Sequence, residues 1–378
     1  MDLLAHSREV ILKYQHKSGA YIACPNFPTY HFCWLRDGSF IAYAMDRSGN
    51  FESSDRFYRW VAMVVERYAG KVAVLAEQLR NNEKPDGSSI LNTRFTLDGF
   101  EEGDNGWGNF QVDGYGSWLW GLAEHVKLSG NASILVDLAK PIQTTIEYLK
   151  LVWKLPNYDC WEEHPEYLHP YSLATTYGGL AAILDLQTSG LLNLPEMGIS
   201  ALMDEVKQFL LQNAVAKNKF TKHILPPNAG LGYTPDATSG VDASLLGLAI
   251  PYKVFPLDDA LMRATIESIE TDLWLKGGGV YRYKADVYYG GGEWVLLTGW
   301  LGWYYALAGQ SAKAQQCKQW MEAQADKNGD LPEQVSQHLL APARQDYWIK
   351  EWGPVATPLL WSHAMYIILA SELETSKH

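Results

Sequence analysis

The sequence lacks the short motifs of common nucleophile, nucleotide and metal sites. Its 378 residues contain no G-x-S-x-G elbow and no G-x-x-x-x-G-K-[ST] phosphate loop. The glycine runs 277–279 and 290–292 lack the strand-turn-helix setting of a phosphate site and are interpreted as tight turns. The ten histidines include no H-E-x-x-H pair. We therefore predict that the protein uses neither a metal ion nor another cofactor.

Cysteine and long apolar runs are also scarce. The chain has four cysteines, Cys24, Cys33, Cys160 and Cys317, with no C-x-x-C spacing. They are too few to stabilise a chain of this length by disulfide bonds, so they are interpreted as reduced thiols in or near the core. The most apolar stretch, residues 294–309, contains three glycines and is shorter than the roughly 20 residues that cross a bilayer. We predict a buried helix there and no membrane partner.

The first 20 residues do not resemble a secretory peptide, because charges at Arg8, Glu9 and Lys13 interrupt the apolar core that such a peptide needs. This pattern predicts a cytoplasmic protein. The net charge is −12 and the basic residues are scattered, which argues against nucleic acid as a ligand. No Pro/Gly/Ser-rich linker or charge block divides the chain, so residues 1–378 are predicted to form a single domain.

Apolar residues recur at helical spacing through most of the chain. Alternating strand patterns are rare, and residues 94–96 and 280–283 are the best strand candidates. The fold is therefore predicted to be all-α. The predicted helices are residues 3–14, 40–45, 57–69, 116–126, 141–154, 173–186, 199–215, 243–248, 257–273, 294–308, 312–325 and 358–374.

Long segments rich in Gly, Trp, Tyr and acidic residues separate these helices. Loops that recur between helix pairs suit an α/α toroid, in which inner and outer helices alternate and the loops at one rim build the site. A solenoid is the competing all-α layout, but no sequence unit repeats at a fixed period. The predicted loops are residues 26–38, 98–114, 159–170, 224–240, 277–293 and 326–354.

Two of these loops carry carboxylates suited to acid–base chemistry. Trp161 stands beside the adjacent Glu162 and Glu163, and an apolar, like-charged setting raises a carboxyl pKa and keeps the group protonated. In the second loop, Pro332 stiffens the approach to Glu333. Hydrolysis of a glycosidic bond needs one carboxyl to protonate the leaving oxygen and another group to activate water or attack carbon. Taken alone, the first motif is more often a solvated loop and the second a helix start.

Five motifs together resemble the glucoamylase family of inverting α-glucosidases, glycoside hydrolase family 15. The resemblance covers nearly the whole chain, and the motifs occur in the family's order. They are Tyr30 with Trp34-Leu35-Arg36-Asp37; the segment from Trp107 through Gln111 to Gly114; Trp161-Glu162-Glu163; Arg282-Tyr283 followed by Asp286, Tyr288, Tyr289 and Trp294; and Glu333-Gln334 followed by Trp361.

This resemblance implies an (α/α)6 barrel with long active-site loops at one rim. It also implies an exo-acting, inverting hydrolase that releases β-glucose from the non-reducing end of short α-glucosides, with Glu162 as general acid and Glu333 as general base. In an inverting pair the carboxyls stand roughly 6.5–9.5 Å apart to admit water. The residues implied in sugar binding are Tyr30, Trp34, Arg36, Asp37, Trp107, Gln111, Trp161, Glu163, Arg282, Tyr283, Tyr288 and Trp361.

Three positions depart from the family pattern. Cys160 replaces a leucine of the fungal enzymes, Phe110 replaces a common proline, and Gly38 follows the Arg-Asp pair. We expect them to touch the pocket wall and the leaving-group side, and so to affect linkage preference. An α-1,6 linkage as in isomaltose is slightly favoured over the α-1,4 linkage or trehalose. The alternatives of another class are a non-catalytic sugar sensor and a disaccharide phosphorylase. Oligomeric state does not follow from the sequence.

Overall fold

The computed structural model describes residues 2–103, 106–228, 230–275 and 277–375. Asp104, Asn105 and Ala229, which belong to two of the predicted loops, lie outside the described residues. Across the described ranges, the α-helices are α1 (Leu3–Tyr14), α2 (Leu35–Arg47), α3 (Phe51–Arg80), α4 (Asp113–Ser129), α5 (Ile134–Val152), α6 (Pro170–Thr188), α7 (Ile199–Asn213), α8 (Ala260–Asp272), α9 (Val295–Leu307), α10 (Ser311–Ala323), α11 (Gln345–Trp352) and α12 (Leu360–Thr375).

Short 3₁₀ helices and two-residue strands complete the described structure. The strands pair antiparallel, as β1 (Cys33–Trp34) with β2 (Arg94–Phe95), β3 (Val215–Ala216) with β4 (Lys219–Phe220), β5 (Ile224–Leu225) with β6 (Thr234–Pro235), and β7 (Glu293–Trp294) with β8 (Gln334–Val335). The 3₁₀ helices are η1 (Pro28–Tyr30), η2 (Ala243–Leu248), η3 (Tyr288–Gly290) and η4 (Pro342–Arg344).

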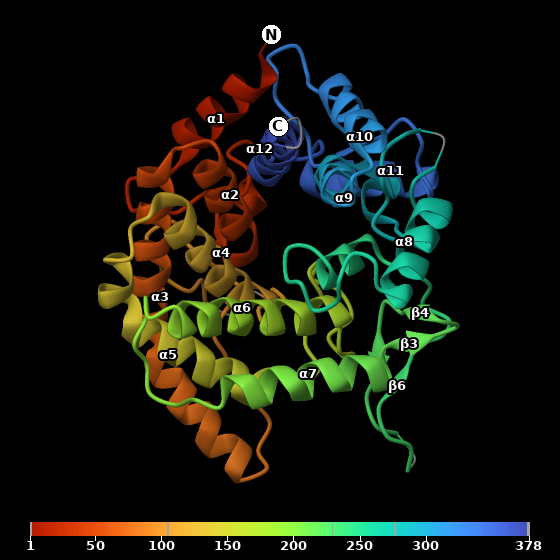
Figure 1. The fold of residues 1–378 in the computed structure, drawn as a ribbon. Coiled ribbons are helices and arrows are strands. Elements are labelled where there is room, and N and C mark those ends of the chain that lie inside the picture. The colour runs from red at the N-terminus through yellow and green to blue at the C-terminus, as the bar shows by residue number, and fades with distance from the viewer. Residues whose placement is uncertain (1, 104–105, 229, 276, 376–378) are drawn as a thin grey trace.

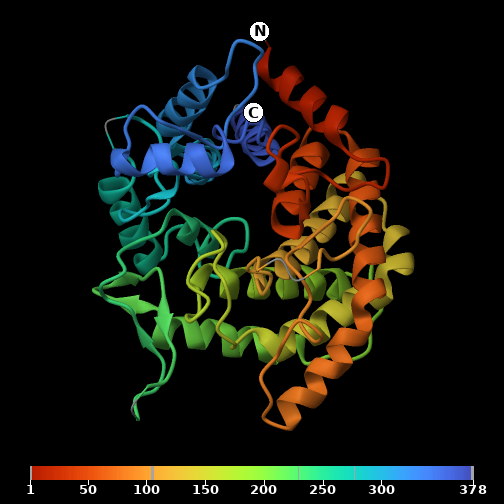
Figure 2. The same ribbon diagram turned by 180° about the vertical axis from the view of Figure 1, so that it is seen from behind.

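The helices form a closed double ring (Figures 1 and 2). Along the inner ring α2 packs on α4, α4 on α6, α6 on η2, η2 on α9, α9 on α12, and α12 returns to α2. The outer helices α1, α3, α5, α7, α8 and α10 alternate with these along the chain and pack on their outer side. This arrangement is an (α/α)6 barrel, so the predicted fold class is confirmed.

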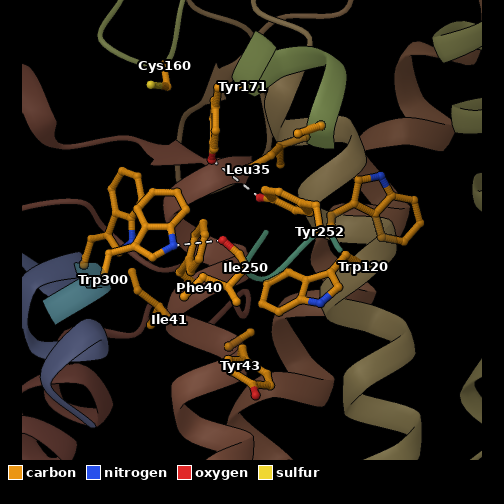
Figure 3. Close-up of a cluster of buried hydrophobic side chains, with 14 of the residues drawn as sticks. Leu35, Phe40, Ile41, Tyr43, Trp120, Cys160, Tyr171, Ile250, Tyr252 and Trp300 are labelled. Carbon is orange, nitrogen blue, oxygen red and sulfur yellow. Dashed lines mark hydrogen bonds between the residues drawn. The ribbon is translucent and has the colours of Figure 1, made fainter. Parts of the chain in front are cut away.

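The inner ring is apolar on nearly all sides because its helices contact neighbours all around. In α9, every residue from Val295 to Ala306 is buried, which confirms the predicted buried helix. Figure 3 shows aromatic side chains filling the centre, where the Phe40 ring lies 5.2 Å from that of Trp300. Phe40 also stacks on Trp361, at 5.3 Å between ring centroids. This core therefore supports Trp361, which lines the cavity described below.

Glycines allow two of the inner helices to touch backbone to backbone. A Cβ atom on Gly116 of α4 would lie 2.1 Å from the Thr175 carbonyl oxygen of α6, and one on Gly179 would lie 2.5 Å from the Gly116 oxygen. Gly38 has a similar role, since a Cβ there would lie 2.4 Å from the Phe57 ring of α3. The expectation that Gly38 touches the pocket wall was therefore wrong, because this glycine is needed for the packing of α2 on α3.

Some local predictions differ from the structure. The predicted helix at residues 243–248 is the 3₁₀ helix η2, and Pro251 soon after it removes a backbone donor that a longer helix would need. The predicted strand at residues 280–283 is replaced by isolated bridges from Val280 to Trp274 and Trp294. Helix α11 lies in a segment predicted to be a loop. Within the described ranges, no helix has the length and apolar character that a membrane crossing needs.

Candidate active site

A cavity of about 440 Å³ opens at one rim of the barrel. Its walls come from segments that each run into an inner helix: β1 into α2, residues 106–108 before α4, residues 158–163 before α6, and residues 331–359 before α12. Figure 2 shows the loops before α4 and α6, coloured orange to yellow, lying towards the centre of the ring. The barrel therefore brings together segments that are far apart in the sequence.

A buried arginine and aspartate form one end of this cavity. Arg36 and Asp37 lie in the first turn of α2 and are 4% and 8% exposed. Arg36 Nη1 donates hydrogen bonds to Gln111 Oε1 and Asp113 Oδ2, both at 3.0 Å, while Arg36 Nε lies 3.3 Å from Asp37 Oδ1. Burial raises the pKa of Asp37 to about 6, although the Arg36 charge acts in the opposite direction. The fixed guanidinium and carboxylate suit recognition of paired hydroxyl groups.

Glu162 is held in a tight turn that points its carboxyl into the cavity. Its backbone is left-handed, with φ 67°, a conformation that is uncommon for a non-glycine residue. Asp159 stabilises the turn, since its Oδ1 accepts hydrogen bonds from the backbone N–H groups of Trp161 (2.9 Å) and Glu163 (2.8 Å). Glu162 Oε1 accepts hydrogen bonds from Trp34 Nε1 (2.5 Å) and Gln111 Nε2 (3.1 Å).

Glu333 lies in a different environment on the same cavity. It is 3% exposed, and the Tyr30 hydroxyl donates a 3.0 Å hydrogen bond to its Oε1. Its Oε2 is buried and accepts no hydrogen bond from the described residues. Burial raises the pKa of the carboxyl to about 7, while the Tyr30 hydrogen bond and the Arg282 charge lower it. The two candidate carboxyls therefore differ in their hydrogen-bond partners, which are an indole and an amide for Glu162 and a phenol for Glu333.

A second charged group surrounds Glu163. Arg282 binds Asp286 through two hydrogen bonds of 2.8 and 2.5 Å and lies 3.4 Å from Glu163 Oε1. The Tyr283 hydroxyl donates to Glu163 Oε2. Although burial of Glu163 acts in the opposite direction, the Arg282 charge and the Tyr283 hydrogen bond hold its pKa below the usual value. Glu163 is therefore a carboxylate acceptor rather than a proton donor.

The structure brings most of the predicted site residues to this cavity. Gln111 and Tyr283 do not line it: Gln111 connects Arg36 to Glu162, and Tyr283 supports Glu163 from behind. Among the described residues, no group of three or more His, Cys, Asp or Glu side chains is placed to hold a metal ion. The predicted residues that line the cavity are Tyr30, Trp34, Arg36, Asp37, Trp107, Trp161, Glu162, Glu163, Arg282, Tyr288, Glu333 and Trp361.

Comparison with known protein families agrees with this architecture. The family model described as glycosyl hydrolases family 15 matches residues 3–339. The chain belongs to this family. It is therefore a glycoside hydrolase, as predicted from the five motifs.

Two relatives match nearly the whole chain. Isomaltose glucohydrolase of Kribbella flavida is 39% identical, over 98% of this chain and 92% of the relative. An uncharacterized glycosyl hydrolase of Methanocaldococcus jannaschii is 29% identical, over 94% of this chain and 53% of the relative. Among solved structures, a wild-type glycosidase is 39% identical, with a TM-score of 0.89 over 99% of this chain and 96% of that one.

Two further structures extend the comparison. A substituted glycosidase in complex with glucose is also 39% identical, with a TM-score of 0.89 over 99% of this chain and 96% of that one. A glucoamylase from Saccharomycopsis fibuligera has a TM-score of 0.71 over 100% of this chain and 96% of that one. Its identity of 15% shows a shared fold only. The barrel is thus common to these proteins.

Two residues that lie behind the wall of this cavity were missed in the sequence. Asp242 accepts hydrogen bonds from Trp161 Nε1 through both carboxylate oxygens, at 3.1 and 3.0 Å. Lys222 lies 3.6 Å from Asp242 and 3.0 Å from the centre of the Tyr283 ring. No motif marks these two residues, because η2 and the segment before β5 bring them in from outside the recognised loops.

Helix α11 contributes two aromatic residues to the cavity that were also missed. Trp348 and Trp352 line the wall, and their spacing of four places both on one face of a helix. This spacing is a helical signal in the sequence, although the composition of residues 326–354 as a whole predicts a loop.

Proposed function

We propose that the protein is an inverting, exo-acting α-glucosidase that releases β-glucose from the non-reducing end of short α-glucosides, with isomaltose-like α-1,6 sugars favoured. Membership of family 15 supports the hydrolytic reaction. The name of the Kribbella flavida relative, isomaltose glucohydrolase, supports the linkage. We further propose that residues 1–378 act as one catalytic domain, since a single closed barrel carries every segment of the cavity.

The unequal environments of Glu162 and Glu333 in one cavity are the observation that carries this proposal. Glu162 Oε1 already accepts two hydrogen bonds, from Trp34 and Gln111, so the acid proton belongs on Oε2. From there it is transferred to the glycosidic oxygen as the bond to the anomeric carbon breaks. The leaving sugar departs with its hydroxyl formed, and Glu162 becomes a carboxylate.

Glu333 acts on the water. Its buried Oε2 has no donor among the described residues and is therefore able to accept a proton from a water molecule as the water oxygen attacks the anomeric carbon. Attack from the face opposite to the leaving group inverts the configuration, so an α-glucoside yields β-glucose. Tyr30 keeps the carboxylate oriented through its hydrogen bond to Oε1.

Arg36 and Asp37 are proposed to bind the hydroxyls of the terminal glucose, with Arg282 contributing a second guanidinium. These groups are nearly fully buried, so the sugar that reaches them must be a chain end. Glu163, held as a carboxylate by Arg282 and Tyr283, is proposed to bind hydroxyls of the sugar on the leaving-group side. This arrangement accounts for exo attack on short substrates.

Proton NMR of the purified protein with isomaltose, maltose and trehalose tests the reaction and the linkage together. We expect β-glucose to appear before mutarotation, and to appear fastest from isomaltose. Glu162→Gln and Glu333→Gln should each lower kcat by about 10²- to 10⁴-fold, because each removes one proton transfer while preserving the shape of the site. Early release of α-glucose would contradict the Glu162 and Glu333 roles, and faster release from maltose or trehalose would reassign the linkage.

A further inference from the structure

Helix α11 is unusual because it carries large aromatic residues but buries none of its side chains completely. Tyr347 is 58% exposed and Trp352 is 39% exposed, and yet Trp352 also lines the catalytic cavity together with Trp348. Trp348 packs against the hydrophobic core, whereas Trp352 is not among the residues that do so. The position of Trp352 therefore needs an explanation other than stability.

The helix is fixed to the catalytic centre and is not a loose flap. Trp348 Nε1 donates a 2.9 Å hydrogen bond to the Val287 carbonyl oxygen, and its ring lies 5.0 Å from that of Tyr288. The Tyr289 hydroxyl donates a 2.9 Å hydrogen bond to the Gly353 carbonyl oxygen at the end of the helix. The middle and the C-terminal end of α11 are thus tied to residues 287–289. These residues adjoin the catalytic base through the 2.9 Å contact between the hydroxyls of Tyr288 and Tyr30.

Trp352 lies beyond Trp348 on the same face. Four residues of α-helix advance by about 6 Å, which is close to the width of one sugar ring. Trp348 is half-buried against Tyr288, whereas Trp352 is exposed, so this step leads from the catalytic centre towards the mouth of the cavity. The Trp352 side chain makes no hydrogen bond and no aromatic ring contact with the described residues. Its indole face is therefore available to a ligand.

From this geometry we infer that Trp352 is a stacking platform for the sugar on the leaving-group side of the scissile bond. The inference rests on the proposed function, because it assumes that the terminal glucose occupies the buried end formed by Arg36 and Asp37. A sugar attached to that glucose must extend towards the mouth, where α11 stands. The apolar C–H face of this sugar packs on the indole, while Glu163 offers a carboxylate to its hydroxyls.

The test compares isomaltose with α-D-glucosyl fluoride, a substrate that has no leaving sugar. Trp352→Ala should lower kcat/KM on isomaltose by about threefold to tenfold, mainly through KM, because one aromatic stacking contact is lost. Its kcat/KM on the fluoride should remain unchanged. Trp352→Phe should recover most of the loss, since a smaller aromatic ring remains.

Tyr347→Ala is the matched control, because Tyr347 is the neighbouring exposed aromatic residue of α11 that does not line the cavity. It should behave like the wild type on both substrates. An unchanged rate of Trp352→Ala on isomaltose, or an equal loss on both substrates, would overturn the inference. Hydrolysis of the fluoride and of isomaltose by the wild-type protein tests the proposed α-glucosidase activity separately. Failure of that activity is therefore distinguishable from failure of the role inferred for Trp352.

Discussion

The acid side of the pH profile gives a sharp test of Glu333 as the base. Burial raises the pKa of Glu333 to about 7 and that of Asp37 to about 6. A general base must be a carboxylate, and so must a group that accepts hydrogen bonds from sugar hydroxyls. Protonation of either residue in the free enzyme therefore inactivates it, and kcat/KM must fall as the pH is lowered.

The size of the effect follows from these two pKa values. Between about pH 7 and pH 6 mainly Glu333 takes up a proton, so log kcat/KM should fall with a slope approaching one. Below about pH 6 Asp37 is protonated as well, and the slope should approach two. With the two groups treated as independent, about half of the molecules carry both carboxylates at pH 7 and about one in 1000 at pH 5, a loss of about 500-fold.

Initial rates of glucose release from isomaltose at low substrate concentration measure this profile. Asp37→Asn is the control: its activity should be lower throughout, but its acid limb should have a limiting slope of one. A single wild-type midpoint near about 4.3, the value of an ordinary glutamate, would refute the reasoning. It would mean either that burial does not govern Glu333 in the hydrated site or that another group is the base.

Two further predictions concern stability. Gly116→Ala should lower the free energy of unfolding by about 3 kcal/mol, because its Cβ would meet the Thr175 carbonyl oxygen of the adjoining helix. Gly70→Ala in α3 is the control, because no atom lies within 4 Å of the new Cβ, and it should raise the free energy of unfolding by about 0.5–1 kcal/mol. Equal free energies of unfolding for the two variants in urea would contradict the close contact of α4 with α6. The Tm should rise as the pH is lowered from about 8.5 to about 7, because burial raises the pKa of Asp159 to about 8 and the folded state then binds the proton more tightly than the unfolded chain. A Tm that falls over this interval in differential scanning calorimetry would show that Asp159 is not buried as described.

The two pH predictions have opposite signs for one physical reason. Burial makes the ionised forms of Glu333, Asp37 and Asp159 costly, which destabilises the fold where these groups are charged. The first two must nevertheless be charged to act on the sugar. The enzyme is thus expected to gain activity and lose stability over part of the same pH range, as is common where a site holds groups in unfavourable environments.

Several elements of the fold could be predicted because local pattern and tertiary contact agree. The helices from α3 to α7 bury one face or more, so apolar periodicity indicates their positions. Most of the predicted ranges are shorter than the helices in the structure. Helix α11 was missed for the opposite reason. It is only eight residues long and has no fully buried residue, so its helical signal is limited to the spacing of Trp348 and Trp352 and is too short to distinguish a helix from a loop.

The sequence by itself determined the all-α class, the acidic and aromatic loops and the carboxylates suited to acid–base chemistry, because each depends on residue type and on short spacings. The family resemblance added the barrel and the residue roles. Only the tertiary structure decided which groups share the cavity, since closure of the inner ring brings Arg36, Glu162 and Glu333 together from segments more than a hundred residues apart. It also decided the burial that raises the pKa of Glu333, the support of Trp161 by Asp242, and the place of Trp352 at the mouth. These properties depend on residues that are distant in the chain, and short-range sequence patterns do not predict such contacts.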